Sequence, residues 1–133
     1  MGRLTAAQPA GRFDRETLDL LDQRREVDID TVRLDGKRAR ATIWIVVGGD
    51  QVYVRSVRGE RGYWYQSARE RPTEVALRVD GMLFPVKAVP ASDDASIEAV
   101  SAGFQSKYSR SGASLASMLQ PKTLGTTLRL EPR

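Results

Sequence analysis

The residues best suited to chemistry in this chain lie between Tyr53 and Tyr65, where the sequence reads YVRSVRGERGYWY. A strand-like start breaks at two glycines and continues into three consecutive aromatic residues. Arginines at the break can donate charge-assisted hydrogen bonds to an anion, and glycines let the backbone approach it closely. Aromatic rings add flat apolar surface. The combination suits a phosphorylated aromatic cofactor, and it also suits an ordinary strand-to-helix connection with a solvated basic loop.

Within this segment, strand alternation puts Arg55 and Val57 on one side and Ser56 on the other. Arg58 and Gly59 follow in the loop. An arginine near the end of a strand, next to serine and glycine, predicts an anion site at that strand end. The alternative is a loop that only needs flexible residues, and the sequence favours neither interpretation.

The three aromatic residues that follow point in different directions if they begin a helix. We expect Trp64 to pack into the core. Tyr63 or Tyr65 then remains to stack on a bound ring or to act as a catalytic proton donor.

A second basic group, Lys37, Arg38 and Arg40 with Thr42, follows an Asp-Gly pair at 35–36 that is typical of a type I′ hairpin turn. Arg38, Arg40 and Thr42 share one strand face and could hold a phosphate. The alternative, which the sequence favours, is a solvated hairpin end whose charges add solubility.

Missing residue types restrict the chemistry further. The chain has 133 residues and contains no cysteine and no histidine. Disulfides, thiolate nucleophiles, Ser-His-Asp triads and the usual zinc ligands are therefore excluded. Acidic residues form no ligand pattern, so we predict no metal site. If the protein is an enzyme, we expect a cofactor to supply the chemistry.

The basic excess is confined to the middle of the chain. The net charge is +4, and residues 33–71 hold nine basic and four acidic side chains. This keeps nucleic-acid binding open as an alternative, although the charge is modest and no nucleic-acid motif is present. No apolar run approaches the roughly 20 residues that span a bilayer, so we expect no membrane association and a cytoplasmic protein.

The pattern of elements predicts a mainly β protein with flanking helices. We expect a flexible tail over 1–12 and one domain over 13–133, with helices over 14–25 and 63–70 and a short helix before Pro121. A further helix, capped by Ser92, should pack through one apolar stripe made of Ile97, Val100, Phe104 and Tyr108. A bulge is expected near Asp30, an edge position or a bulge at Pro85, and solvated side chains at Asp28 and Asp30. Six antiparallel strands then form a small closed barrel, over residues 26–34, 38–47, 51–57, 74–79, 82–89 and 123–130.

Several of these motifs together resemble a known superfamily. They are the GKRARAT hairpin, a GGD turn, the YVRS strand, a glycine loop leading into Trp64, a second Asp-Gly hairpin, and the SMLQP and TTLRL stretches near the C-terminus. The chain resembles the split-barrel flavin- and deazaflavin-binding proteins, relatives of pyridoxamine-phosphate oxidase and of deazaflavin-dependent nitroreductases. More closely, it resembles a small bacterial family of unknown function (the 2255 type) in that superfamily.

The resemblance implies a six-stranded split barrel, usually a homodimer, that binds FMN or a deazaflavin and transfers a hydride to a small organic substrate. By position, Arg40 and Thr42 would lie near the cofactor tail. Further residues would border the ring and phosphate (Arg55, Ser56, Val57), close the loop (Arg58, Gly59) or anchor the following helix (Trp64).

One departure from the superfamily stands out, since Arg58, Glu60 and Arg61 are bulkier than the usual loop. This keeps open a member that binds no cofactor. It also leaves open a non-catalytic binding module that uses the same cleft for another anionic ligand.

Overall fold

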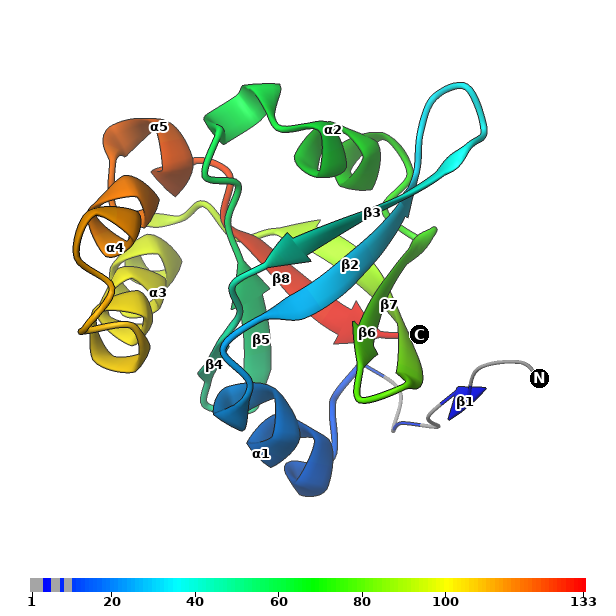
Figure 1. The fold of residues 1–133 in the computed structure, drawn as a ribbon, viewed down its shortest axis with the longest axis horizontal. Helices are drawn as coiled ribbons and strands as arrows, with labels where there is room; N and C mark the ends of the chain where they lie inside the picture. Colours follow the sequence, from blue (N-terminus) through cyan, green and yellow to red (C-terminus); the bar gives the residue numbers. More distant parts are fainter. Residues whose placement is uncertain (1–3, 6–7, 9–10) are drawn as a thin grey trace.

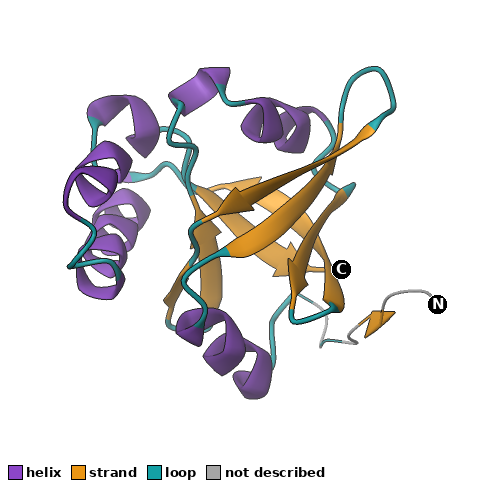
Figure 2. Ribbon diagram, in the orientation of Figure 1, coloured by secondary structure: helices purple, strands orange, loops and turns teal. Residues whose placement is uncertain are grey.

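The chain folds into a strongly curved sheet that is flanked by helices (Figures 1 and 2). The structure is a computed structural model that describes residues 4–5, 8 and 11–133. Its main strands are β2 (Val27–Val32), β3 (Arg38–Ile43), β4 (Val46–Gly48), β5 (Gln51–Val54), β6 (Val75–Val79), β7 (Met82–Pro90) and β8 (Leu128–Pro132). They follow one path, β3-β2-β6-β7-β8-β5-β4. Every neighbouring pair on this path is antiparallel.

The helices lie outside the sheet and cover its two ends. Figure 1 shows α1 (Arg15–Gln23) at one end of the barrel and α2 (Tyr63–Glu70) at the other, with the short 3-10 turn η1 (Gly59–Arg61) leading into α2. Three further helices, α3 (Asp94–Lys107), α4 (Gly112–Met118) and α5 (Pro121–Leu124), form a group beside the sheet. The mainly β class with flanking helices is confirmed.

The number of strands differs from the prediction of six. The expected strand over 38–47 is two strands, because the chain leaves the ladder at Trp44 and Ile45. There the Tyr108 hydroxyl accepts a hydrogen bond from the Ile45 N–H (3.1 Å), and Lys107 donates to the Ile45 carbonyl (2.8 Å). These side chains take the place of a neighbouring strand. The path therefore has seven strands. The prediction of a closed barrel is also wrong, because the two end strands of the described sheet, β3 and β4, do not pair with each other.

Local signals placed several elements correctly. α1 begins after Asp14, whose carboxylate accepts from the Thr17 N–H, and α2 covers the predicted 63–70. The hairpin at Asp80 and Gly81 has the two positive φ values, 52° and 78°, that a type I′ turn needs. The earlier turn is different. Only Gly36 has a positive φ there, so the type I′ prediction for 35–36 is wrong.

Two predicted irregularities in the strands are also wrong. β2 alternates without a bulge near Asp30, and Thr31 takes the buried position that follows Val27 and Ile29. Pro85 does not lie on an edge strand, since β7 pairs with both β6 and β8. Its missing N–H is tolerated because the ladder with β8 begins only at the next residue, Val86.

Elements near the two termini also differ from their predicted bounds. Asp93, not Ser92, caps α3 by accepting from the Ser96 N–H. The last strand begins at residue 128 rather than 123, because Pro121 starts the extra helix α5. The expected tail 1–12 lies partly outside the described residues; within it, β1 (Leu4–Thr5) pairs in parallel with β7.

Besides the main core inside the curved sheet, a second apolar cluster joins the helical group to the sheet. It contains Val100, Phe104 and Tyr108 of the predicted helical stripe, packed on Val46 and Met118. At its edge, Trp44 stacks flat on Tyr108, with ring centroids 3.9 Å apart. The predicted packing role of the stripe is confirmed, and this junction fixes where α3 and α4 stand relative to β4.

Lys107 gives this junction a pH dependence. Its ammonium group donates to the carbonyls of Leu21 (3.1 Å) and Ile45 (2.8 Å). Burial lowers the pKa of Lys107 to about 8, although the Asp22 carboxylate opposes the shift. Burial also raises the pKa of Tyr108 to about 12.

We therefore expect the free energy of unfolding to rise between pH 8 and 10, because the unfolded chain there binds the Lys107 proton that the folded chain has lost. Above pH 10 Tyr108 acts in the opposite direction, since it ionises first in the unfolded chain. Urea unfolding at several pH values measures the effect. Lys107→Met should remove the rise, whereas Lys87→Met, at an exposed site, should keep it; an equal rise in Lys107→Met would contradict the assignment.

Candidate functional site

A cleft of about 1510 Å³ opens at the mouth of the barrel. Its walls come from β3, from the loop after β5, from α2 and from α4. On β3 the side chains of Ala39 and Ala41 line the cleft and are half-buried. Because these two side chains are small, the space between β3 and α2 stays open.

The structure brings most of the predicted site residues to this cleft. Nine of the twelve line it: Arg40, Thr42, Arg55, Ser56, Val57, Arg58, Tyr63, Trp64 and Tyr65. Lys37 and Arg38 do not line it, because they lie at the exposed hairpin end of β3. Gly59 is buried in η1, where an added Cβ would lie 2.8 Å from the Lys122 carbonyl oxygen.

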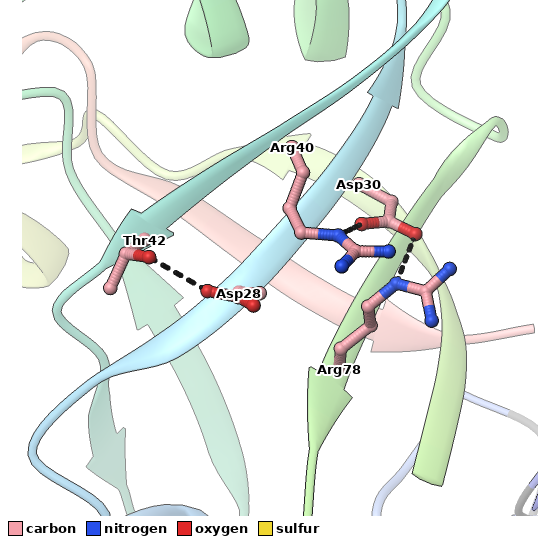
Figure 3. Close-up of polar contacts among 5 residues, drawn as sticks. All are labelled: Asp28, Asp30, Arg40, Thr42 and Arg78. Atoms are coloured by element: carbon pink, nitrogen blue, oxygen red, sulfur yellow. Dashed lines mark hydrogen bonds and ion pairs between the residues drawn. The ribbon is translucent and has the colours of Figure 1, made fainter. Parts of the chain in front are cut away.

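The outer face of β3 is already paired with carboxylates (Figure 3). Asp30 accepts from Arg40 at 3.1 Å and from Arg78 at 2.6 Å, and Asp28 accepts from the Thr42 hydroxyl at 2.8 Å. The expectation that the two aspartates are solvated is therefore wrong. Arg40 and Thr42 do share a face, as predicted, but an anion bound there would compete with both carboxylates.

Arg55 is fully buried and its guanidinium is occupied by the protein itself. It donates to the hydroxyls of Thr127 (2.8 Å) and Ser101 (2.9 Å) and to the carbonyls of Ile97 (2.9 Å) and Met118 (3.3 Å). Burial lowers its pKa to about 10, so it stays protonated at neutral pH. Arg55 thus ties α3, α4 and the start of β8 to the end of β5.

Ser56, the next residue, presents a hydroxyl group that is not used. Its N–H donates to the Thr126 hydroxyl at 3.0 Å, and its side chain is only 1% exposed. Among the described residues, no group forms a hydrogen bond with its Oγ. The Oγ lies 2.2 Å from where a Cβ on Gly62 would stand, so glycine at 62 is needed for this contact.

Two exposed arginines of the cleft have no carboxylate partner in the described part of the chain: Arg58 in the loop after β5, and Arg69 on α2. Arg69 instead donates to the Tyr65 hydroxyl at 2.9 Å. Sequence reasoning overlooked Arg69, although its spacing of four residues from Tyr65 on a predicted helix was the available signal. It also overlooked Ser114 and Ser117 of α4, which only the tertiary fold brings to the cleft.

The aromatic residues of α2 divide as their helical directions require. Tyr63 is 78% exposed, whereas Tyr65 is 4% exposed. Trp64 is half-buried and packs against the barrel core, as expected. The described chain has three large hydrophobic residues that are exposed, and all three line the cleft: Leu34, Val57 and Tyr63. The cleft therefore presents exposed apolar side chains beside its charged ones.

Two further observations concern the described residues. No helix there is both long enough and apolar enough to cross a membrane. Nor does any group of three or more carboxylate side chains stand close enough together to hold a metal ion.

A curved antiparallel sheet with a helix over a cleft at its mouth defines the chain as a split-barrel protein, and solved structures of this fold are similar to it. One is an F420-H2-dependent reductase (FDR-A), at 14% identity and a TM-score of 0.60, covering 81% of this chain and 95% of that one. The chain belongs to DUF2255, a family of uncharacterized proteins conserved in bacteria, whose profile matches residues 17–130. No curated protein matches it.

Two further similar structures extend the comparison. A putative pyridoxamine 5′-phosphate oxidase from Listeria innocua has 14% identity and a TM-score of 0.63, covering 89% of this chain and 91% of that one. The heme storage protein HutZ from Vibrio cholerae has 15% identity and a TM-score of 0.63, covering 92% and 91%. At these identities the similarity shows the fold alone.

Proposed function

We propose that the protein binds a flavin or a deazaflavin in this cleft and uses it to transfer a hydride to a small organic substrate. The observation that carries the proposal is the composition of the cleft. An unpaired buried hydroxyl (Ser56), two arginines without carboxylate partners (Arg58 and Arg69) and an exposed aromatic ring (Tyr63) line one cavity. The fold is one that an F420-H2-dependent reductase also has.

The lining residues fit such a ligand by chemical type. The apolar rim of Leu34, Val57 and Tyr63 can cover a ring system, and Arg58 and Arg69 can pair with a phosphate or an acidic tail. When bound, the cofactor would supply hydride transfer.

The chain's own residues would bind and orient the ligand and exclude water. Tyr63 is the better candidate for a proton donor, because its side chain is exposed in the cleft whereas the Tyr65 hydroxyl is held by Arg69. Arg40 and Thr42 would contact the cofactor tail only by giving up their hydrogen bonds to Asp30 and Asp28. Lys37 and Arg38 would contact only a ligand that extends past the hairpin.

A heme ligand has less support. Heme iron in proteins is held by histidine, cysteine, methionine or tyrosine. The chain has neither histidine nor cysteine, so the two commonest ligands are missing. We favour the flavin-type ligand for this reason.

The apolar rim is also where a second copy of the chain could pack, and homodimerisation through it remains part of the proposal.

Two alternative functions have different support from the structure. A non-catalytic module for an anionic ligand would use the same cleft and would bind without turnover. The structure gives less support to nucleic-acid binding, because Asp28 and Asp30 pair with the polar side chains on the exposed face of β3.

The decisive experiment is a titration of the purified protein with FMN and, separately, with a deazaflavin, followed by visible absorbance and fluorescence. We expect one of them to bind with a Kd well below 1 mM, which corresponds to about −4.1 kcal/mol. Arg58→Ala combined with Arg69→Ala should weaken binding about tenfold or more, because the two unpaired cations of the cleft are lost.

The matched control is Arg12→Ala, since Arg12 is exposed, pairs with Asp50 and does not line the cleft. This variant should bind as the wild type does. If neither ligand binds more tightly than about 1 mM, the cofactor proposal is wrong.

A further inference from the structure

β3 is an end strand of the described sheet, so one of its two edges has no neighbouring strand. At the hairpin, the Arg33 N–H donates to the Lys37 carbonyl, which makes these two residues a hydrogen-bonded pair. Hydrogen-bonded and non-bonded pairs alternate along an antiparallel ladder. Ala39 and Ala41 therefore bond to β2. The N–H and C=O groups of three alternate residues point away from it instead: Arg38, Arg40 and Thr42.

These backbone groups are free, and those of Arg40 and Thr42 are presented to the cleft. Among the described residues, the backbone hydrogen bonds outside helices and strands include none from them. Six consecutive residues, 39–44, line the cleft. Successive side chains of a strand point to opposite faces. An unbroken run of lining residues therefore indicates that the cleft meets β3 along its open edge and not only on one face.

The strand at the other end of the sheet does not offer such an edge. β4 has only three residues. α3 also packs on it so closely that a Cβ on Gly103 would clash with the Val46 side chain. The open edge of β3 is therefore the longer one and the one that borders a cavity.

The cleft has room for an extended chain beside this edge. Its volume of about 1510 Å³ exceeds the roughly 300–1,000 Å³ of most small-molecule sites. Exposed apolar side chains line it as well (Leu34, Val57 and Tyr63). An extended peptide that adds a strand to a sheet edge gains affinity from main-chain hydrogen bonds and specificity from its alternating side chains.

The two faces of β3 indicate which side chains such a peptide should carry. On the outer face, Arg38 is exposed and has no carboxylate partner among the described residues. Arg40 is exposed beside it and shares Asp30 with another arginine (Figure 3). On the inner face, Ala39 and Ala41 are small and half-buried. Acidic side chains suit the first face, and apolar side chains fill the space beside the second.

Charge also argues against a second copy of β3 as the added strand. Antiparallel pairing of two β3 edges would put Arg38 and Arg40 of both copies on one face. Like charges on neighbouring strands are destabilising, and charged edge strands are a common way to prevent self-pairing. The edge is therefore closed to itself and open to a strand of opposite charge.

We propose that the open edge of β3 accepts an extended peptide segment as an additional strand. Acidic side chains of the peptide lie beside Arg38 and Arg40, and apolar side chains lie over Ala39 and Ala41. The peptide backbone pairs with the free N–H and C=O groups of the edge. This inference does not rest on the proposed function, because no cofactor takes part in the binding or in its test.

The test uses the full chain and the synthetic peptide acetyl-VEVEVE-amide, with amide hydrogen exchange followed by NMR. Without peptide, the N–H groups of Arg40 and Thr42 should exchange quickly, and those of Ala39 and Ala41 slowly. Saturating peptide should slow exchange at Arg40 and Thr42 at least tenfold. If exchange there does not change at millimolar peptide, the proposal is wrong. Slow exchange without peptide that increases with protein concentration would also overturn it, because a second copy would then cover the edge.

Two peptide controls separate strand addition from general attraction. The basic peptide acetyl-VKVKVK-amide has the same apolar residues and should bind at least tenfold more weakly. Methylating alternate backbone nitrogens of the acidic peptide gives two further probes, one methylated at valine and one at glutamate. Only one set of nitrogens faces β3, so one probe should lose binding and the other should keep it. Equal binding of the acidic and basic peptides, or of the two methylated ones, would contradict the proposal.

A charge reversal tests the role of the outer face. Arg38→Glu should weaken the acidic peptide about fivefold to tenfold and strengthen the basic one, as expected for cross-strand charge pairs. The matched control is Lys87→Glu, which makes the same change in charge at an exposed site on β7 that does not line the cleft. It should bind both peptides as the wild type does. If the two variants behave alike, the peptide responds to net charge and the edge site is wrong.

Discussion

Arg55→Ala is expected to lower the free energy of unfolding by about 3 kcal/mol or more. The substitution removes the Arg55 donor from the hydroxyls of Ser101 and Thr127 and from the carbonyls of Ile97 and Met118, of which the Met118 carbonyl still accepts from the Thr123 hydroxyl. Each buried acceptor left unpaired costs about 1 kcal/mol or more. The change also opens a cavity where a fully buried side chain stood, next to the ring of Phe104.

Part of this loss is offset, because the wild-type protein already carries the cost of burying a charge without a carboxylate partner, as the lowered pKa of Arg55 shows. Arg55→Lys keeps the charge, but a lysine ammonium cannot reach the four acceptors that the planar guanidinium of arginine contacts. This variant should therefore also be clearly destabilised. Urea unfolding measures both variants. Arg58→Ala, at an exposed position three residues further along the chain, should stay within about 0.5 kcal/mol of the wild type. If Arg55→Ala were equally mild, the structural role of Arg55 would be wrong.

Gly59→Ala is expected to cost about 3 kcal/mol in the free energy of unfolding. Gly59 has a φ of +69°, a conformation that alanine adopts at a cost of about 1–2 kcal/mol. In addition, its Cβ would lie 2.8 Å from the Lys122 carbonyl oxygen, which belongs to the backbone and cannot rotate away. Relieving that contact means moving η1 away from α5, and with it the start of α2.

The matched control is Gly36→Ala, at a φ of +85° with no atom within 4 Å of the new Cβ. It should show the conformational cost alone, about 1–2 kcal/mol. Chemical denaturation of the two variants side by side isolates the steric part of the Gly59 effect. Equal losses at the two positions would show that the contact with the Lys122 carbonyl adds no cost to the Gly59→Ala substitution.

Local elements could be predicted well because their signals are local. The Asp14 cap, the span of α2 and the type I′ turn at Asp80 each depend on residues within one or two turns of chain. The strand over 38–47 failed for the opposite reason. The break at Ile45 is made by Tyr108 and Lys107, more than sixty residues away, and no pattern within the strand shows it.

The site was predictable to the same extent. The segment between Tyr53 and Tyr65, together with the basic strand after Gly36, does contribute much of the cleft. Which of its cations are free was not predictable. Arg40 pairs with Asp30 of the neighbouring strand, and Arg55 is held by α3, α4 and the start of β8, whereas Arg58 and Arg69 have no carboxylate partner among the described residues.

The sequence by itself determined the element types, the mainly β class and the stretch of chain that forms the cleft, because periodicity, caps and turns act over a few residues. Only the tertiary structure decided which polar groups in that cleft remain unpaired. A guanidinium or a hydroxyl is free or occupied according to partners that the fold brings from distant parts of the chain. The unpaired Ser56 hydroxyl beside the uncapped start of α2 is the clearest result of that selection.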